Sequence, residues 1–451
     1  LLMAAAIAAA AMSGCSGSGN TVATTAAKTE AADGQATQEE KTEAPAASGE
    51  SIRVAWWGNQ KRADATIAAF DAFAKESGVN FTYEYNSYNA YWETLATQSV
   101  GNNLPGIVQQ VTDQYAGYIN NGLLLDLTPY VESGALDLSD CDEAYISGGN
   151  YKDGLYGVSL GTNVMTVMYN ADLFEAAGVE PPKMGWTWSD FVQTARDIYA
   201  KTGVQTENIA LGMPRYLLET MIRSKGQSLY SEDGKGFGFD DETKAQIVQV
   251  IQDCYDLTQE DVFVDPGDQL LWKDNSERAL CTGEAAMGMN WSSQFSNFSG
   301  YYNLNLEMAT QPLFDGATEK GMYLRPAQFF SVTKDCPDPE AAAKAISFFI
   351  NDKGANEILN GERGIPAAKA IREELKGKAS DTEKKVYDFM DAVIDYCRDA
   401  DPAEPSNSRQ EGTEKVDNTV YIWYNVSIKY RRCFYDRTTA EIGAKSIHGN
   451  I

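Results

Sequence analysis

One stretch of the sequence decides the fold: LYGVSLGTNVMTVMYNADLFEAAGVEPPKMGWTWSDF, residues 155–191. Its middle, VMTVMY (164–169), is apolar and rich in residues that favour strands. Thr187 to Asp190 form a capping box, after which apolar residues from Phe191 to Tyr199 recur at helical spacing. A strand, a loop and an amphipathic helix in this order predict an α/β unit.

The same alternation continues on both sides of this stretch. We predict strands at IRVAWW (52–57), FTYEY (81–85), IVQQV (107–111), VMTVMY (164–169), AAMGMN (285–290) and FFSV (329–332). We predict helices around Ile67, after the cap and first-turn proline Asp338-Pro339, and from Val386 to Cys397. The fold class is therefore α/β.

The first residues form an apolar run that stops at Cys15. The run is shorter than the roughly 20 apolar residues of a membrane span, and we interpret residues 1–14 as a signal peptide that lacks its basic start. Met12-Ser13-Gly14-Cys15 resembles the bacterial lipoprotein lipobox. This resemblance implies cleavage before Cys15 and lipid attachment to its sulfur, which would hold the protein at a membrane.

Residues 15–50 read as a flexible linker, because Val22 is their only large apolar side chain. The body that begins at Ser51 is long enough to form two or three domains. Its composition, with 43% hydrophobic and 11% aromatic residues over the whole chain, is that of a globular protein.

Charge and cysteine content exclude several classes of partner. The net charge of −27 repels nucleic acid phosphates, so we expect no nucleic acid partner. Beyond Cys15 the cysteines lie at 141, 254, 281, 336, 397 and 433, without the C-x-x-C spacing or histidine clusters of a zinc site. We expect isolated buried thiols in preference to a disulfide framework.

Polar and aromatic residues follow three of the predicted strands. These are Trp56-Trp57-Gly58-Asn59, Thr112-Asp113 and Asn290-Trp291. Ligands of open α/β sheets sit beyond the carboxyl ends of strands. Sugars offer C–H faces to aromatic rings and hydroxyl groups to amides, carboxylates and guanidinium groups. Core packing would explain one tryptophan; the repetition at strand ends predicts a sugar site.

The body resembles the extracellular solute-binding proteins of ABC sugar importers, family 1, with maltose-binding-like lobes. The resemblance rests on the stretch 155–191 and on RVAWWGNQKRADATIAAFDAFAKESGVNFTYEY, INNGLLLDLTPYVESGALDLSD, GEAAMGMNWSSQF and NEILNGERGIPAA, in the family's usual order. It implies a two-lobe, periplasmic-binding-protein-like clamshell of type II, with sheets flanked by helices and hinge crossings between lobes. Lobe 1 would comprise 51–162 and 325–368, and lobe 2 would comprise 163–324 and 369–417.

The resemblance also implies a set of ligand-binding residues. They are Trp57, Asn59, Asp113, Thr162, Asn163, Trp291 and Arg325. Arg325 could equally form a surface ion pair.

Two features depart from the family pattern. Leu104-Pro105-Gly106 stands where the family commonly has Pro-Asp, which removes a carboxylate from that place. Residues 418–451 carry five Lys or Arg against two Asp or Glu, and they contain the single histidine, His448. We expect either a reading-frame slip near Asn418 or a genuine basic tail.

Enzyme motifs are weak in this sequence. Gly157-Val158-Ser159-Leu160-Gly161 matches G-x-S-x-G, but the residues that follow favour a strand where a nucleophile elbow needs a helix. Residues 231–242 resemble a calcium loop only in part, and we expect a surface hairpin there. The chain has no phosphate-binding G-x-x-x-x-G-K-[ST]. A glycosidase needs only a pair of carboxylates, which 64 acidic residues could supply.

We therefore expect a non-enzymatic, lipid-anchored component of an ABC transporter on the outer face of the cytoplasmic membrane, as on Gram-positive-type cell surfaces. It would capture a carbohydrate, an oligosaccharide above all, by lobe closure and pass it to membrane permease subunits served by a separate ATPase. No cofactor is expected, and the protein would be a monomer. The alternatives are a surface-tethered glycosidase, a receptor for a non-sugar ligand, and a scaffold or sensory protein that binds no small ligand.

Overall fold

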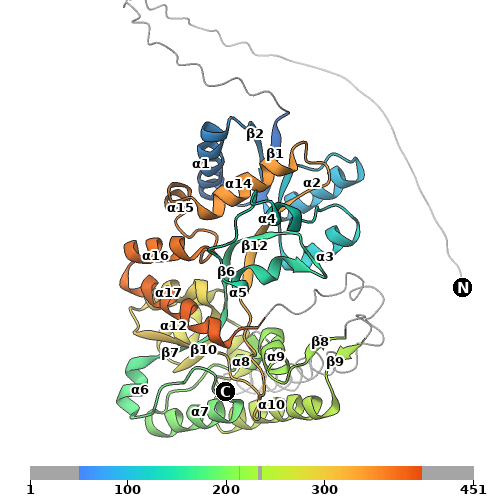
Figure 1. Ribbon diagram of the computed structural model, residues 1–451. Coiled ribbons are helices and arrows are strands. Elements are labelled where there is room, and N and C mark those ends of the chain that lie inside the picture. The colour runs from blue at the N-terminus through green and yellow to red at the C-terminus, as the bar shows by residue number, and fades with distance from the viewer. Residues whose placement is uncertain (1–49, 213, 232–235, 399–451) are drawn as a thin grey trace, which may run out of the picture. The chain divides into compact units, whose positions relative to one another are not determined.

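The fold is seen in a computed structural model that describes residues 50–212, 214–231 and 236–398 (Figure 1). Cys15, the linker and residues 418–451 lie outside this part of the chain. The described residues belong to one compact unit with two larger β-sheets, each packed against its own helices. We call the five-stranded sheet with its helices lobe 1 and the three-stranded sheet with its helices lobe 2.

The lobe 1 sheet has the strand order β2-β1-β3-β12-β6. Its strands are β1 (Ile52–Trp57), β2 (Phe81–Asn86), β3 (Ile107–Gln110), β6 (Val158–Asn163) and β12 (Arg325–Val332). β1 pairs in parallel with β2 and β3, whereas β12 runs antiparallel to β3 and β6. The carboxyl ends of β1 and β3 consequently meet at one edge of the sheet.

Helices cover both faces of this sheet. On one face, α1 (Gln60–Ser77), α14 (Pro339–Asn351) and α15 (Lys353–Leu359) enclose a core that contains Phe70, Phe330 and Phe349. On the other face, α2 (Tyr88–Val100) and α3 (Thr112–Asn120) contribute Tyr91 and Tyr115 to a second core. Asp338 caps α14 through Ala341, and Pro339 opens that helix as predicted.

The lobe 2 sheet has the strand order β10-β7-β11, and all its pairs are antiparallel. Its strands are β7 (Met165–Asn170), β10 (Met287–Trp291) and β11 (Leu306–Ala309). Along β7, Val167 faces a core built with α7 (Trp188–Thr202), α9 (Pro214–Arg223) and α10 (Asp241–Gln259), while Met168 faces one built with α13 (Phe295–Tyr301) and α17 (Asp381–Val393). Side-chain alternation therefore builds two cores from one buried strand.

Short elements connect these layers. The helices are α4 (Thr128–Glu132), α5 (Glu143–Ile146), α6 (Ala171–Ala177), α8 (Ile209–Gly212), α11 (Pro266–Gln269), α12 (Ala279–Thr282) and α16 (Lys369–Lys378), with 3-10 turns η1 (Ser147–Gly149), η2 (Asn275–Glu277), η3 (Ser292–Gln294) and η4 (Ile394–Tyr396). The two-stranded pairs are β4 (Asn150–Tyr151) with β5 (Gly154–Leu155) and β8 (Ser228–Tyr230) with β9 (Phe237–Gly238). The pairing of β8 with β9 forms a hairpin whose second strand lies in the predicted range 231–242, while its first strand ends before that range.

Most predicted elements are confirmed, with shifted ends. Thr187 and Asp190 form both hydrogen bonds of the predicted capping box at the start of α7. The last predicted helix, Val386 to Cys397, is wrong at its carboxyl end. α17 ends at Val393, and Cys397 lies beyond a 3-10 turn. Of the strands in the two larger sheets, β6 and β11 were not predicted.

The chain passes between the two sheets where β6 leads through Val164 into β7, and β12 brings it back to the lobe 1 sheet. A third passage, residues 360–368, joins α15 of lobe 1 to α16, which packs on α17. The residue limits predicted for the lobes stay a prediction.

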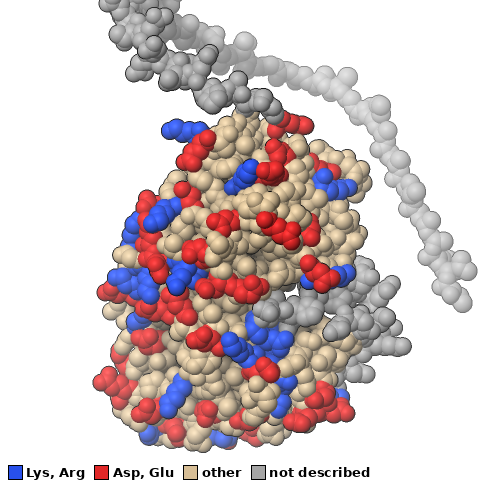
Figure 2. All heavy atoms as spheres, in the orientation of Figure 1, with Lys and Arg blue, Asp and Glu red and all other residues tan. Residues whose placement is uncertain are grey.

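Among the described helices, none combines the length and apolar composition needed to cross a bilayer. On the face of the molecule that Figure 2 shows, acidic side chains are spread over both lobes.

Candidate binding site

Trp57 ends β1 and lies in a cluster of aromatic rings. Its ring centroid is 5.4 Å from that of Tyr88, 5.3 Å from Tyr91 and 5.7 Å from Trp92. The partners come from the first turns of α2, which follows the neighbouring strand β2. Trp57 is half-buried, so part of the cluster remains open at the carboxyl edge of the sheet. Such a surface suits the apolar face of a sugar.

Asn59 and Asp113 occupy helix starts at the same edge. Asn59 caps α1, where its Oδ1 accepts a hydrogen bond from the backbone N–H of Arg62 at 3.0 Å. This contact explains the residue in structural terms, although the side chain is exposed. Asp113 is the second residue of α3, and its side chain lies outside what the structure describes. Ligand contact stays a prediction for both.

Gln110 is a candidate that the sequence reading missed. The parallel register pairs Ala55 with Val108, so Trp57 and Gln110 end their strands side by side. Gln110 is fully buried, and in the described part of the chain neither its Oε1 nor its Nε2 has a hydrogen-bond partner. The Trp92 Nε1 and the Thr112 Oγ1 are likewise buried without a partner. The signal in the sequence was the polar pair that ends the apolar strand IVQQ.

Buried polar groups without partners are rare in folded proteins, because each costs about 1–3 kcal/mol. Three of them gather beside the Trp57 cluster. They are closed off from solvent in this conformation, so a ligand with several hydroxyl groups would satisfy them only after a change in conformation exposes them.

A second aromatic group lies at the end of β10 in lobe 2. The rings of Trp291 and Tyr216 meet edge to face, with centroids 4.8 Å apart. The Arg325 guanidinium carbon lies 5.5 Å from the Trp291 ring and 5.4 Å from the Tyr216 ring, and Arg325 donates a hydrogen bond to the Tyr216 hydroxyl. The structure thus brings two predicted residues together. Tyr216, on α9, was missed because no strand end or motif marks it.

Thr162 and Asn163 end β6, where the chain leaves lobe 1. Thr162 is fully buried, and its hydroxyl lies 3.2 Å from the Ser159 Oγ. Its backbone pairs with Ile365, with N–O distances of 2.8 and 3.1 Å in the two directions. Asn163 lies opposite Arg325 in the strand register, and its Oδ1 is buried without a partner. Thr162 therefore has a structural role, while Asn163 remains a candidate for binding.

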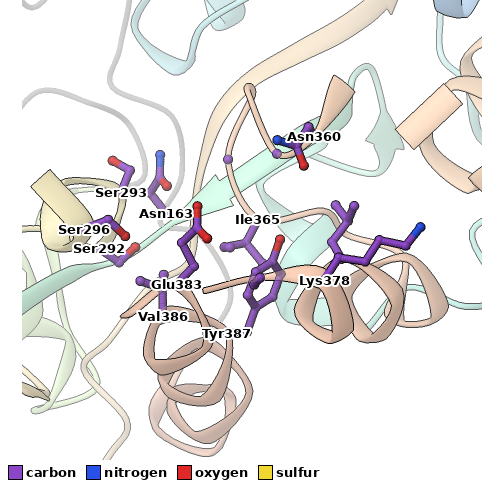
Figure 3. Close-up of a pocket in the computed structure, with 14 residues that line it drawn as sticks. Asn163, Ser292, Ser293, Ser296, Asn360, Ile365, Lys378, Glu383, Val386 and Tyr387 are labelled. Atoms are coloured by element: carbon purple, nitrogen blue, oxygen red, sulfur yellow. The ribbon is translucent and has the colours of Figure 1, made fainter. Parts of the chain in front are cut away.

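Asn163 also lines a cavity of about 260 Å³ beside the chain passages (Figure 3). In Figure 3, Ser293 and Ser296 lie on the same side of this cavity as Asn163, and Glu383 and Tyr387 project from α17. Glu383 accepts hydrogen bonds from the Ser380 Oγ and N–H at 2.7 and 2.9 Å, which lower the pKa of its carboxyl group. The cavity wall is polar, but its carboxylate already has partners.

Gly106, at the departure from the family's Pro-Asp, lies in a packed place. A Cβ atom there would come within 2.9 Å of the Cys336 Sγ and 3.0 Å of the Ile52 Cγ2. An aspartate side chain has no room in this packing. The glycine is therefore explained by the thiol that lies against it.

The enzyme-like features have structural explanations. Ser159 is 1% exposed within β6 and is followed by strand, so it cannot act as an exposed nucleophile. Every described carboxyl group with a shifted pKa shifts downward, by hydrogen bonds or nearby cations, as in Asp137, Glu260 and Glu374. The general acid of a glycosidase needs a carboxyl group whose pKa is raised. No group of metal-ligating side chains is found within the described residues.

A two-lobe α/β body with aromatic groups at strand ends in both lobes is typical of proteins that capture a ligand between lobes. The sequence profile of the bacterial extracellular solute-binding proteins matches residues 68–385. The chain belongs to this family. It is also 23% identical over 363 residues to an uncharacterized lipoprotein of Streptomyces antibioticus, covering 78% of this chain and 76% of that protein.

Solved structures confirm the fold. A family 1 extracellular solute-binding protein from Alicyclobacillus acidocaldarius matches with a TM-score of 0.71 at 22% identity, over 85% of this chain and 96% of that one. An oligogalacturonide-binding protein from Yersinia enterocolitica matches with a TM-score of 0.67 at 22% identity, over 85% and 99%. An ABC substrate-binding protein from Listeria monocytogenes, in complex with cycloalternan, gives 0.60 at 22% identity, over 85% and 98%.

Proposed function

We propose that this protein is the substrate-binding component of an ABC importer and that it captures an oligosaccharide by lobe closure. The proposal is carried by the open aromatic group at Trp57, next to the unpartnered carboxamide of Gln110. A sugar ring can stack on the aromatic group while its hydroxyl groups bond to the amide. Trp291 and Tyr216 would provide the contact from lobe 2, together with Arg325, which lies against both rings at the start of the lobe 1 strand β12.

The size of the ligand is inferred from two considerations. The aromatic groups lie at strand ends of two different sheets, so they offer two separate stacking surfaces, one for each of two sugar rings. The solved relatives from Yersinia enterocolitica and Listeria monocytogenes are described with an oligogalacturonide and with cycloalternan. By analogy with them, we favour an oligosaccharide over a monosaccharide.

We infer that the protein is anchored to a membrane from the lipobox-like sequence that ends at Cys15. A lipid on this sulfur would hold the protein on the outer face of the cytoplasmic membrane as a monomer, with residues 16–50 as its tether. The ligand-bound form would then dock on permease subunits whose ATPase is a separate chain. Mass spectrometry of protein from membranes tests the anchor, because an acylated Cys15 must appear as the first residue.

Fluorescence titration tests the binding itself. The full chain, with Cys15→Ser to prevent acylation, is titrated with neutral and acidic oligosaccharides while tryptophan emission and sugar integrity are followed. We expect a saturable change without cleavage. Trp291→Ala should weaken binding by at least about tenfold, because stacked aromatic residues dominate such contacts. Trp272→Ala, in a half-buried position beside Arg278, serves as the control and should leave affinity unchanged.

Other outcomes would overturn the proposal in different ways. Cleavage of the sugar would identify a tethered glycosidase. Absence of any saturable change across the panel would exclude carbohydrate capture.

A further inference from the structure

The third passage between the sheets, residues 360–368, is fixed against lobe 1. Ile365 pairs with Thr162 of β6 through two backbone hydrogen bonds of 2.8 and 3.1 Å. The contact with β6 is close, since a Cβ atom on Gly161 would lie 2.2 Å from the Arg363 carbonyl oxygen. Thus the first half of the passage behaves as part of the lobe 1 sheet.

Arg363 fixes the passage to the middle of that sheet. It is 3% exposed, and its Nη1 donates to the Gln109 Oε1 at 2.6 Å and to the Gln328 Oε1 at 3.2 Å. Its Nη2 donates to the Thr66 Oγ1 at 2.7 Å. Gln109 belongs to β3 and directly precedes Gln110, the unpartnered amide of the candidate site. The guanidinium therefore joins the passage to the strand that ends in that site.

Glu362 connects the same passage to Trp57. The Arg62 Nε donates to both carboxylate oxygens of Glu362, at 2.9 and 3.0 Å. The Arg62 Nη1 also donates to the carbonyl oxygen of Trp57 at 3.3 Å. Both side chains of the ion pair are 19% exposed, so water screens the pair only in part. One arginine thus holds the aromatic end of β1 and the passage together.

We propose that Glu362, Arg62 and Arg363 are positioning residues for ligand capture. They keep the first half of the third passage and the Trp57–Gln110 edge in one rigid arrangement, which leaves bending between lobes to residues after Ile365. This inference rests on the proposed function. Without these contacts, ligand binding would have to order the passage, and that entropy cost would weaken affinity.

A matched ion pair provides the control. Arg196 on α7 binds Glu260, at the end of α10, through two hydrogen bonds of 2.7 and 2.8 Å. This pair is likewise an arginine bound to both oxygens of a glutamate, although through Nε and Nη2 and with side chains 39% and 42% exposed. It lies within lobe 2 and touches none of the passage residues. Glu362→Gln and Glu260→Gln therefore remove comparable charge pairs, and only the first is expected to affect binding.

The test combines two measurements on the full chain with Cys15→Ser. Hydrogen exchange of the Ile365 amide is measured without sugar, and affinity is measured with the tightest-binding sugar of the fluorescence panel. For Glu362→Gln we expect exchange about tenfold faster or more and affinity about three- to tenfold weaker. Glu260→Gln should change neither, and it should lower the unfolding midpoint less than Glu362→Gln does, because its ion pair is more exposed.

A swapped pair checks the role of the charges. In Arg62→Glu with Glu362→Arg, the carboxylate moves to the third residue of α1, where it suits a helix start. Recovery of slow Ile365 exchange in this double variant supports the proposal. Three results would overturn it: unchanged Ile365 exchange in Glu362→Gln, an equal acceleration of Ile365 exchange in Glu362→Gln and Glu260→Gln, or no recovery of slow exchange in the double variant. Because exchange needs no sugar, these results hold even if no sugar binds.

Discussion

Two arginines with little exposure, Arg278 in lobe 2 and the buried Arg363 in lobe 1, are held in different ways. Arg278 pairs with Glu207, a fully buried carboxylate that also accepts a hydrogen bond from the Leu280 N–H at 3.0 Å. Arg363 contacts only amide and hydroxyl oxygens among its hydrogen-bond partners, and it lies over the rings of Phe330 and Phe349 at 5.3 and 5.7 Å. Arg278 also lies over two rings, those of Trp272 and Phe298, at 5.8 and 5.4 Å, so the difference is the counter-charge: Glu207 neutralises Arg278, whereas Arg363 is solvated by dipoles and rings alone.

The pKa values follow this difference. Burial lowers the pKa of Arg363 to about 9, with a contribution from the nearby Arg62 charge. Burial acts in the same direction on Arg278, but Glu207 reverses it and the pKa of Arg278 is raised. Both groups stay charged at neutral pH. The comparison teaches that removal of a partner should cost far more in lobe 2 than in lobe 1.

The largest expected effect is that of Glu207→Gln. The substitution leaves Arg278 buried without a counter-charge and should lower the free energy of unfolding by about 3–5 kcal/mol. Urea unfolding measures this loss. Glu260→Gln, which disturbs the exposed Arg196 pair, should cost less than about 1 kcal/mol. Equal losses in the two variants would remove the distinction between buried and exposed pairs.

Next in size is Arg363→Met. The apolar side chain can pack over the two phenylalanine rings, but Gln109 and Gln328 lose their shared donor, which should cost about 1–3 kcal/mol. Arg278→Met should cost more, because it leaves a buried carboxylate unpaired. Chemical unfolding of both variants under the same conditions compares their losses in free energy of unfolding. If Arg363→Met were the costlier change, the contrast between the two arginines would be wrong.

A smaller effect is expected at the start of α17, where Ser380 and Glu383 form a capping box. Ser380→Ala should cost about 1 kcal/mol at pH 7. Because the folded-state pKa of Glu383 is lowered, its contribution is present above the ordinary carboxyl pKa and is lost as pH falls through the folded-state value. Thermal unfolding from pH 7 to pH 3 should therefore show the two proteins converging. A difference that stays constant over this range would contradict the assignment.

The smallest change in stability is expected for Gln110→Leu. Its amide has no partner to lose, so the free energy of unfolding should stay constant or rise by up to about 1 kcal/mol, while sugar affinity falls. Gln109→Leu is the matched control next to it, since it removes an Arg363 partner and should destabilise the protein. Loss of stability in Gln110→Leu would mean that the amide has a structural role.

Much of the fold could be predicted from local pattern, and the exceptions have physical reasons. β1, β2, β7 and β10 are rich in β-branched, aromatic and other apolar residues, and their positions were predicted closely. β6 (VSLGTN) was missed because glycine and asparagine, which are depleted in strands, weaken its local strand signal, and the strand forms through pairing with β12. A strand end could be recognised locally, but pairing between distant segments could not.

The candidate site divides in the same way. Trp57, Trp291 and Arg325 could be predicted because strand ends or family resemblance marked them. Tyr216 lies 109 residues from Arg325 in the sequence, and Thr66 lies 297 residues from Arg363. Neither contact could therefore be predicted from neighbouring residues in the sequence. The unpartnered state of Gln110 depends on its surroundings in the folded chain. Whether these residues bind ligand stays a prediction.

The cysteines of the described chain also have a practical consequence. Four of the five free thiols are buried and Cys141 is half-buried, and burial raises the pKa of Cys336 to about 11 and those of Cys141, Cys281 and Cys397 to about 12. Thiols that stay protonated react slowly with maleimides. A dye could therefore be attached to a new surface cysteine on each lobe, with only Cys15 and Cys433 replaced, and lobe movements could be followed by energy transfer in an otherwise native protein.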